Sequence, residues 1–432
     1  MTNVLRFISI SALVLAGEVT LYAAGALPPK EPGQKEVRIS LAEAIERVKE
    51  HHPDLALQQL AVARAREEVM LATRAFLPDI DADYIASSAA GGFGLIMTAA
   101  RLLKPVFSLK SLLADKQIKR LLHDRENVML QVQDLEVTQD VKELYVSLLI
   151  QTRVIRVLDE NASRARKRQE LKEALYKEGR ITHEELLRQK TDFEKALAES
   201  EKAGVYLARS ESAFKTLLGL ESDKPSLESP AGESSFSLTL EDCFDLAYRK
   251  NPLLKALFLL EEASEKERGK WKSKFVVDGL FVGLGESGGG LFSGRARLGA
   301  TGSVSLYDWG KTGIRNRIRD LDHERLLLEH EKRFEDLRNS ISENYAGLKA
   351  LESEKNAAKA ELESAGESLR QKQLYVEAGR TRQEELLQAE TESSLEELNF
   401  WQKSLEAWLV RERLLKNLGI SGMSELREAL PS

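Results

Sequence analysis

The sequence predicts a mainly α-helical protein with a smaller β part, built from one unit that occurs twice. Three observations predict it: two long segments with almost no glycine or proline, segments that alternate with period two, and motifs that recur about 200 residues later. The composition agrees, because 31% of the 432 residues are charged and only 6% are aromatic. Long amphipathic helices have this composition.

Charge and cysteine content exclude two broad classes of protein. The formal net charge is −6, so no basic excess favours nucleic acid as a partner. The single cysteine, Cys243, excludes an internal disulfide framework.

Residues 1–26 have the pattern of a signal peptide. Arg6 precedes an apolar run, Phe7 to Gly17, that is too short to span a bilayer. Small residues then favour cleavage after Ala26, although Glu18 interrupts the pattern. An earlier cut near Gly17 and an uncleaved anchor are the alternatives. No later stretch of 18 apolar residues occurs, so any membrane insertion of the mature chain requires strands.

The internal repeat covers most of the mature chain. Three landmarks keep nearly the same spacing: Ser40 to Pro53 recurs as Thr239 to Pro252, Gly179 recurs as Gly379, and Gly219 recurs as Gly419. The period is too long for a solenoid, so the repeat is a duplicated, domain-sized unit. We therefore expect a first repeat at 27–219, a linker at 220–237, a second repeat at 238–419 and a tail at 420–432.

Each repeat is expected to open with a short helix. Ser40 and Thr239 have an acidic residue three positions later, which is close to the capping-box pattern. Pro53 and Pro252 then interrupt the helix, because proline lacks a backbone donor and clashes with the preceding turn. A second helix is expected to follow, ending near residues 77 and 274.

Very long helices are predicted from about residue 109 to 177 and from 314 to 378. The first range lacks proline and glycine, and each helix would reach roughly 100 Å at 1.5 Å per residue. Return helices should run to Gly219 and Gly419. Their heptad-like apolar spacing predicts packing as antiparallel coiled coils. A plain coiled-coil rod is the alternative, but it leaves the β segments unexplained.

The clearest strand is Arg295 to Tyr307, which alternates small or apolar residues with polar ones. This alternation is typical of transmembrane barrels, and also of a half-buried strand in a soluble sheet. Residues 275–284 are the expected partner strand, with 286–294 as the loop. In the first repeat a hairpin is expected at about 79–109, with strand 79–87, a turn at Gly91-Gly92 and a return over 95–109. Four strands cannot close a barrel, so a membrane location requires an oligomer.

Together these features resemble the TolC family of outer-membrane efflux and secretion channels. The resemblance rests on the two openings that end in His52-Pro53 and Asn251-Pro252, on the turn Asp308-Trp309-Gly310 after the strand, and on Gly179-Arg180-Ile181-Thr182 with Glu185. The first repeat has Ser108-Leu109-Lys110 where the second has Asp308-Trp309-Gly310, so its hairpin departs from the pattern.

The resemblance implies a homotrimer with a twelve-stranded barrel, four strands per chain, in the outer membrane of a Gram-negative-type cell. The helices would form a tunnel in the periplasm, with a collar drawn from residues 27–35, 221–237 and the tail. It implies a passive exit duct that contacts outer-membrane lipid, a periplasmic adaptor and an inner-membrane transporter of RND, ABC or MFS type. A periplasmic coiled-coil tether without a channel is the alternative. The residues specify neither the cargo nor the class of pump.

The candidate functional residues lie at the two helical tips. Gly179 and Gly379 are expected to end the long helices in the left-handed conformation, and Thr182 and Thr381 to cap the return helices. The resemblance makes Arg180, Arg380 and Arg382 candidates for adaptor contacts. It places the entrance, or gate, at Glu185, Glu385 and Gln388, although glutamates near a helix start also suit the helix dipole.

No catalytic constellation is recognisable, so we expect no enzyme activity and no cofactor. No histidine pair at i, i+4 and no Cys-His spacing suggests a metal site. Cys243 lies in the apolar register of a short helix and is expected to be core.

Overall fold

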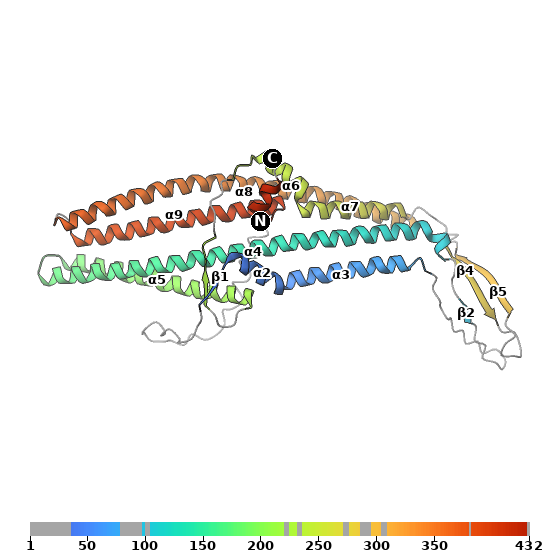
Figure 1. Ribbon diagram of the computed structural model, residues 1–432, viewed down its shortest axis with the longest axis horizontal. Coiled ribbons are helices and arrows are strands. Elements are labelled where there is room, and N and C mark those ends of the chain that lie inside the picture. The colour runs from blue at the N-terminus through green and yellow to red at the C-terminus, as the bar shows by residue number, and fades with distance from the viewer. Residues whose placement is uncertain are drawn as a thin grey trace, which may run out of the picture.

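The computed structural model describes residues 36–77, 97–99, 104–219, 224–230, 236–270, 276–285, 295–303, 309–379 and 382–429. They form an elongated helical bundle with β4 and β5 at one end and two helix-to-helix tips at the other (Figure 1). The expected signal peptide and the expected strand 79–87 lie outside these residues.

The order of helices in the first half is repeated in the second half. The first half contains α2 (Leu41–His51), α3 (Pro53–Arg74), α4 (Lys104–Lys177) and α5 (His183–Leu218). The second contains α6 (Leu240–Lys250), α7 (Pro252–Lys270), α8 (Lys311–Glu377) and α9 (Gln383–Leu418), followed by α10 (Met423–Ala429). The 74 residues of α4 span roughly 110 Å at 1.5 Å per residue, so the predicted very long helices are confirmed.

The short helices begin at the predicted caps. Ser40 accepts a hydrogen bond from the backbone N–H of Glu43, and Thr239 accepts one from that of Asp242. The capping box is complete only at Thr239, because the side chain of Asp242 also accepts from the cap backbone. Arg47 pairs with the Glu43 carboxylate at 2.7 Å, so that carboxylate is engaged elsewhere.

Two small sheets are present among the described residues. β1 (Glu36–Ile39) pairs in parallel with β3 (Lys224–Leu227). β4 (Val276–Gly285) is antiparallel to both β2 (Met97–Ala99) and β5 (Arg295–Ser303). The pairing predicted for the second-half hairpin is therefore confirmed.

The predicted return strand over 95–109 is wrong in its second part. Among the described residues of this range, Met97–Ala99 form β2, and α4 begins at Lys104, five residues before the helix was expected. Pro105 stands at the second residue of this helix, where its fixed φ suits the first turn and its missing N–H is not needed.

Each half has its own, equivalent core at the level of α2 and α6, here called the waist. The first includes Ile39, Val48, Val141, Tyr145 and Leu148, and the second includes Leu238, Ala247, Ile341, Leu348 and Leu418. Tyr145 Oη donates to the backbone oxygen of Ile39 at 3.0 Å, and Tyr345 Oη donates to that of Leu238 at 3.3 Å. The duplication therefore extends to single hydrogen bonds.

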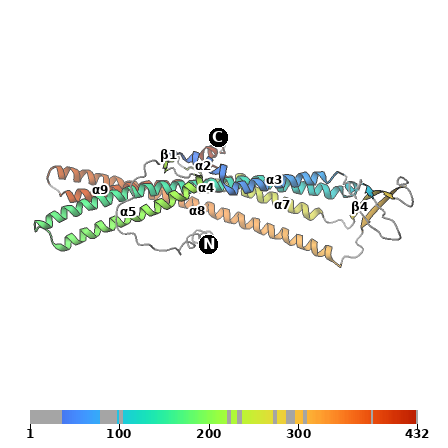
Figure 2. The same ribbon diagram turned by 90° about the horizontal axis from the view of Figure 1, so that it is seen from below.

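In the part of the molecule between the waist and the strands, the helices lie side by side in the order α3, α4, α7 and α8 (Figure 2). Toward the tips the order is α5, α4, α9 and α8. The contact of α4 with α7 and α9, here called the inner seam, joins the two halves of one chain. Across the described ranges, no helix has both the length and the apolar character needed to cross a membrane.

Candidate functional site at the helical tips

The first tip is a glycine turn followed by a capped helix. Gly179 has φ 72°, and the backbone N–H of Arg180 donates to the oxygen of Leu175 at 2.9 Å, which closes the end of α4. Thr182 then accepts from the backbone N–H of Glu185 at 3.3 Å and caps α5. The side chains of Arg180, Thr182 and Glu185 are exposed at this end of the molecule.

The second tip has the same turn but a different cap. Gly379 has φ 67°, as predicted. The residue at the start of α9 is Arg382, which makes no side-chain capping bond. Thr381 was predicted as this cap, which is wrong: it lies one position too early, because Thr182 corresponds to Arg382. Arg380 and Thr381 themselves lie outside the described residues.

The three residues predicted to form the gate lie on two different helices at the tips. Glu185, Glu385 and Gln388 are all exposed, and they lie on α5 and α9. Glu385 forms an ion pair with Lys372 of α8 at 2.5 Å, within its own hairpin.

A lysine that the sequence reasoning missed joins the two tips. Lys172 of α4 pairs with Glu384 of α9 at 2.9 Å, so it connects the two hairpins. No local motif identifies this pair, because its members are 212 positions apart in the sequence. The signal is the duplication itself, which makes Lys172 the counterpart of Lys372.

Lys172 and Glu384 belong to a row of ion pairs along the inner seam. Its members join α4 to α9 from the waist to the tips: Lys142–Glu412, Glu143–Arg413, Arg153–Glu397, Arg164–Glu390 and Lys172–Glu384. The first pair is buried, with side chains 9% and 6% exposed, and Lys142 also donates to the backbone oxygen of Ser421 at 2.9 Å. The two halves of the chain are thus fastened by charge as well as by apolar contact.

Carboxyl groups near the buried pair have shifted pKa values. Burial raises the pKa of the Asp140 carboxyl, with Lys416 acting against it. The pKa of Glu143 is lowered: burial acts upward, but hydrogen bonds from Arg413 and Gln139 outweigh it. The inner seam therefore keeps Glu143 in its charged, paired form.

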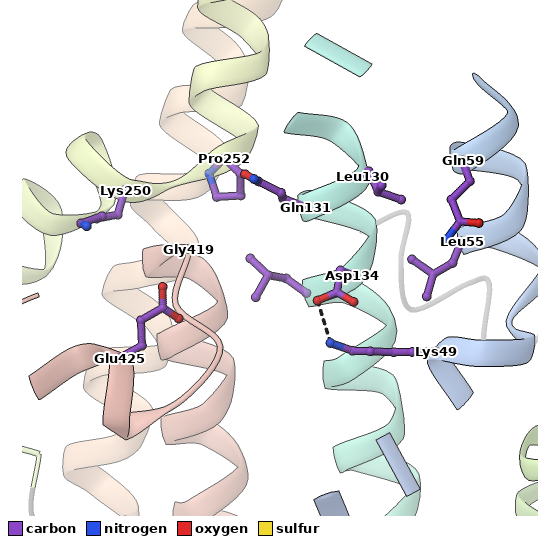
Figure 3. Close-up of a pocket in the computed structure, with 11 residues that line it drawn as sticks. Lys49, Leu55, Gln59, Leu130, Gln131, Asp134, Lys250, Pro252, Gly419 and Glu425 are labelled. Atoms are coloured by element: carbon purple, nitrogen blue, oxygen red, sulfur yellow. Dashed lines mark hydrogen bonds and ion pairs between the residues drawn. The ribbon is translucent and has the colours of Figure 1, made fainter. Parts of the chain in front are cut away.

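A cavity of about 540 Å³ lies at the waist between the halves (Figure 3). Lys49, Leu55 and Asp134 line it from the first half, and Pro252 and Gly419 from the second. Figure 3 shows the Lys49–Asp134 ion pair, 2.7 Å long, across one wall. The polar groups do not converge on a common point, so the cavity is a packing feature of the inner seam.

The predicted turn before α8 is partly described. Trp309 has φ 55° and is 78% exposed, and Gly310 has φ 77° and forms the N-cap of α8. Asp308 lies outside the described residues. Positive φ is uncommon for a residue other than glycine, so Trp309 is held in a strained turn. Within the part of the chain that is described, no group of three or more potential ligands could hold a metal ion.

The geometry agrees with comparisons to known proteins. Residues 44–220 match the family model described as outer membrane efflux protein. No curated protein matches the chain in sequence. The fold is similar to the Campylobacter jejuni CmeC outer membrane channel, with a TM-score of 0.72 and 12% identity over 96% of this chain and 98% of that one.

Two further solved structures have the same architecture. The outer membrane protein VceC of Vibrio cholerae has a TM-score of 0.69 and 14% identity, over 88% of this chain and 96% of that one. The MtrE outer membrane channel of Neisseria gonorrhoeae has a TM-score of 0.64 and 16% identity, over 88% of this chain and 89% of that one. The chain thus has the fold of the TolC-like channels. The likeness to the outer membrane efflux protein family covers residues 44–220.

Proposed function

We propose that the chain is the outer-membrane exit duct of an efflux or secretion system, a passive conduit without catalysis, and that it works as a homotrimer. The observation that carries this proposal is a set of apolar helix faces that are buried in one half and bare in the other. A ring of copies would bury them and enclose a tunnel.

The bare faces lie on α3 and α8, the outer helices of the row. Ile118 and Val128 of α4 are 8% and 6% exposed, whereas their counterparts Ile318 and Leu328 of α8 are 51% and 61% exposed. Leu57 of α3 is 64% exposed, and its counterpart Ala256 of α7 is 2% exposed. Bare apolar faces of this extent mark an interaction surface.

The duplication indicates what covers these faces. Within the chain, the first half presents α4 to α7 and α9 of the second half. The equivalent contact would present α8 to α3 and α5 of another copy, here called the outer seam. Because the two contacting faces of each copy differ, the contact is heterologous, and such a contact forms a ring when the rotation between copies closes. Three copies are proposed from the family likeness.

The waist offers a second site for the same contact. A groove of about 170 Å³ is lined by Tyr248, Leu254 and Phe334, the counterparts of Lys49, Leu55 and Asp134. In the cavity of about 540 Å³, the equivalent residues of the first half face Pro252 and Gly419 of the second half. In the ring, the groove would by analogy face Pro53 and Gly219 of the next copy.

The tips are proposed to dock a periplasmic adaptor that connects the duct to an inner-membrane transporter. The exposed side chains of Arg180, Thr182 and Arg382 are available for polar contacts there. Glu185, Glu385 and Gln388 would line the narrow entrance, where rings of carboxylates favour cations. The strand end of the molecule would lie in the outer membrane.

The test is the mass and the planar-bilayer conductance of the detergent-extracted mature protein. We expect a trimer with cation-preferring conductance, and a weaker cation preference in Glu385→Ala. Ile318→Asp combined with Leu328→Asp should give monomers of unchanged helix content by circular dichroism, because both positions are exposed in the single chain. A trimer whose conductance is indifferent to Glu385→Ala would refute only the gate.

Membrane fractionation separates the duct from the alternative, a periplasmic coiled-coil tether. An integral duct stays with the outer membrane after carbonate extraction, whereas a tether is released. A carbonate-soluble monomer or dimer without conductance would refute the duct and leave the tether.

A further inference from the structure

The two seams of the ring differ in chemistry, and this difference singles out one residue pair. The inference rests on the proposed ring of copies. In the inner seam, five ion pairs join α4 to α9. Adding 200 to a position in α4 and subtracting 200 from a position in α9 gives the positions that would meet in the outer seam, on α8 of one copy and α5 of the next.

Most of the charge pairs are absent from those positions. The counterparts of three of them are Ser342 and Ser212, Ser353 and Leu197, and Ser364 and Lys190. Those of the fourth are Glu343 and Ala213. One pair keeps opposite charges: Lys372 and Glu184 correspond to Lys172 and Glu384, at the tip.

Apolar side chains of α5 are left exposed where the outer seam would form. Leu187 and Val205 of α5 are 50% and 70% exposed, whereas their counterparts Leu387 and Leu405 of α9 are 8% and 6% exposed. The outer seam would therefore be held mainly by apolar contact, which is not directional. A charge pair at its tip would be the main contact that fixes its register.

Lys372 is already close to the position that this contact requires. In the single chain its ammonium group pairs with Glu385 of the same hairpin, and its side chain is 35% exposed. Lys172, its counterpart, pairs instead with Glu384 of the neighbouring hairpin and is 16% exposed. The difference follows from the neighbour: α9 lies beside α4, while the helix that would lie beside α8 belongs to another copy.

We propose that ring assembly transfers the Lys372 ammonium group from Glu385 to Glu184 of the adjoining copy. The transfer latches the outer seam at the tip. It also frees the Glu385 carboxylate, so the ring of acidic groups at the tunnel entrance would form only on assembly. Glu385 and Glu184 thus compete for a single lysine, and the latch and the entrance charge are coupled.

Disulfide trapping tests the proposed contact. Lys372→Cys and Glu184→Cys are combined in a Cys243→Ala background, since Cys243 is buried and its counterpart in the first half is Ala44. Matched controls are Lys172→Cys with Glu384→Cys and Lys372→Cys with Glu385→Cys, whose partners are in contact within one chain. After oxidation with copper phenanthroline, we expect covalent dimers and trimers from the test pair and only intrachain links from the controls.

The outcomes separate this inference from the proposed function. A trimer by mass that yields no covalent multimers from the test pair, while both controls close, overturns the latch and keeps the duct. A protein that is monomeric by mass overturns both.

Charge reversal gives an independent measurement. Lys372→Glu should lower the fraction of oligomer that survives dilution, and adding Glu184→Lys should restore it. Restoration by Glu385→Lys instead would show that the pair within the hairpin is the one that matters, and would refute the transfer.

Discussion

Gly419 and its counterpart Gly219 offer a matched test of how the waist is packed. Both end a return helix in the left-handed conformation, with φ 80° and 66°. A Cβ atom at Gly419 would lie 2.7 Å from the Cα of Asn251 and 2.8 Å from the backbone oxygen of Lys250. A Cβ atom at Gly219 would meet nothing within 4 Å. Of these two positions, both favour glycine through their positive φ, but Gly419 alone also lacks room for a Cβ atom.

These distances give different magnitudes for the two alanine variants. Left-handed backbone destabilises a residue with a Cβ atom by about 1–2 kcal/mol, which is the expected loss for Gly219→Ala. Gly419→Ala adds a clash with backbone atoms, and overpacking of this kind typically destabilises by about 1–3 kcal/mol. We therefore expect Gly419→Ala to lower the free energy of unfolding by roughly 2–5 kcal/mol.

The assay is denaturant unfolding in detergent, followed by far-UV circular dichroism, with midpoints compared at equal slope. Asparagine substitutions at both sites separate the two causes, because asparagine tolerates the left-handed region but carries a Cβ atom. Gly219→Asn should be close to wild type and Gly419→Asn should remain destabilised. Equal losses at both positions would refute the close-contact argument.

Three further predictions concern single sites. Glu412→Gln should lower the free energy of unfolding by about 3–5 kcal/mol, because it leaves the Lys142 ammonium group buried without its counter-charge. Replacing both residues, as Lys142→Met with Glu412→Leu, should recover most of the loss. The exposed pair Arg166–Glu170 is the control, with an expected effect of about 0–1 kcal/mol in the same unfolding assay. Arg382→Thr should supply the missing cap of α9 and stabilise its first turn by about 0.5–2 kcal/mol, seen as slower amide hydrogen exchange, and unchanged exchange would contradict the assignment of the cap. Burial raises the pKa of the Cys243 thiol to about 12, so the thiol should resist alkylation in the folded protein. Because the thiol of the unfolded chain ionises at lower pH, the free energy of unfolding should fall as pH rises from 9 toward 12. This fall should be larger in the wild type than in Cys243→Ala.

The periodic parts of the molecule could be predicted from local signals. Ser40 and Thr239 begin their helices, and Gly179 and Gly379 end the long ones with positive φ, because capping and left-handed turns depend on residues a few positions apart. The capping signal failed at the start of α9, where two neighbouring residues were candidates for the N-cap. Thr381 has the chemistry of a cap, but the chain places Arg382 at that position.

Contacts between distant segments could not be predicted in this way. The Lys142–Glu412 and Lys172–Glu384 pairs join residues more than 200 positions apart, and no local pattern marks a lysine that pairs across the bundle. The start of α4 was also misplaced, since the apolar run around residues 95–109 suits a strand as well as a helix. The repeat offset is the one long-range signal in the sequence. It identifies Lys372 as the counterpart of Lys172, but the structure was needed to show which partner Lys172 has.

The different chemistry of the two seams has a physical reason in the proposed ring. The halves of one chain are tethered, so the inner seam forms at high effective concentration and tolerates pairs such as Lys142–Glu412, whose charges lose their hydration on burial. The outer seam would have to offset the lost translational and rotational freedom of separate copies. Apolar faces such as those around Leu328 and Val205 supply that free energy without a desolvation penalty. A single exposed charge pair at the tip, Lys372 with Glu184, would then set the register at little desolvation cost. A partner bound at the tip would compete most easily with this pair, and it would thereby loosen the outer seam while the inner seam stays intact.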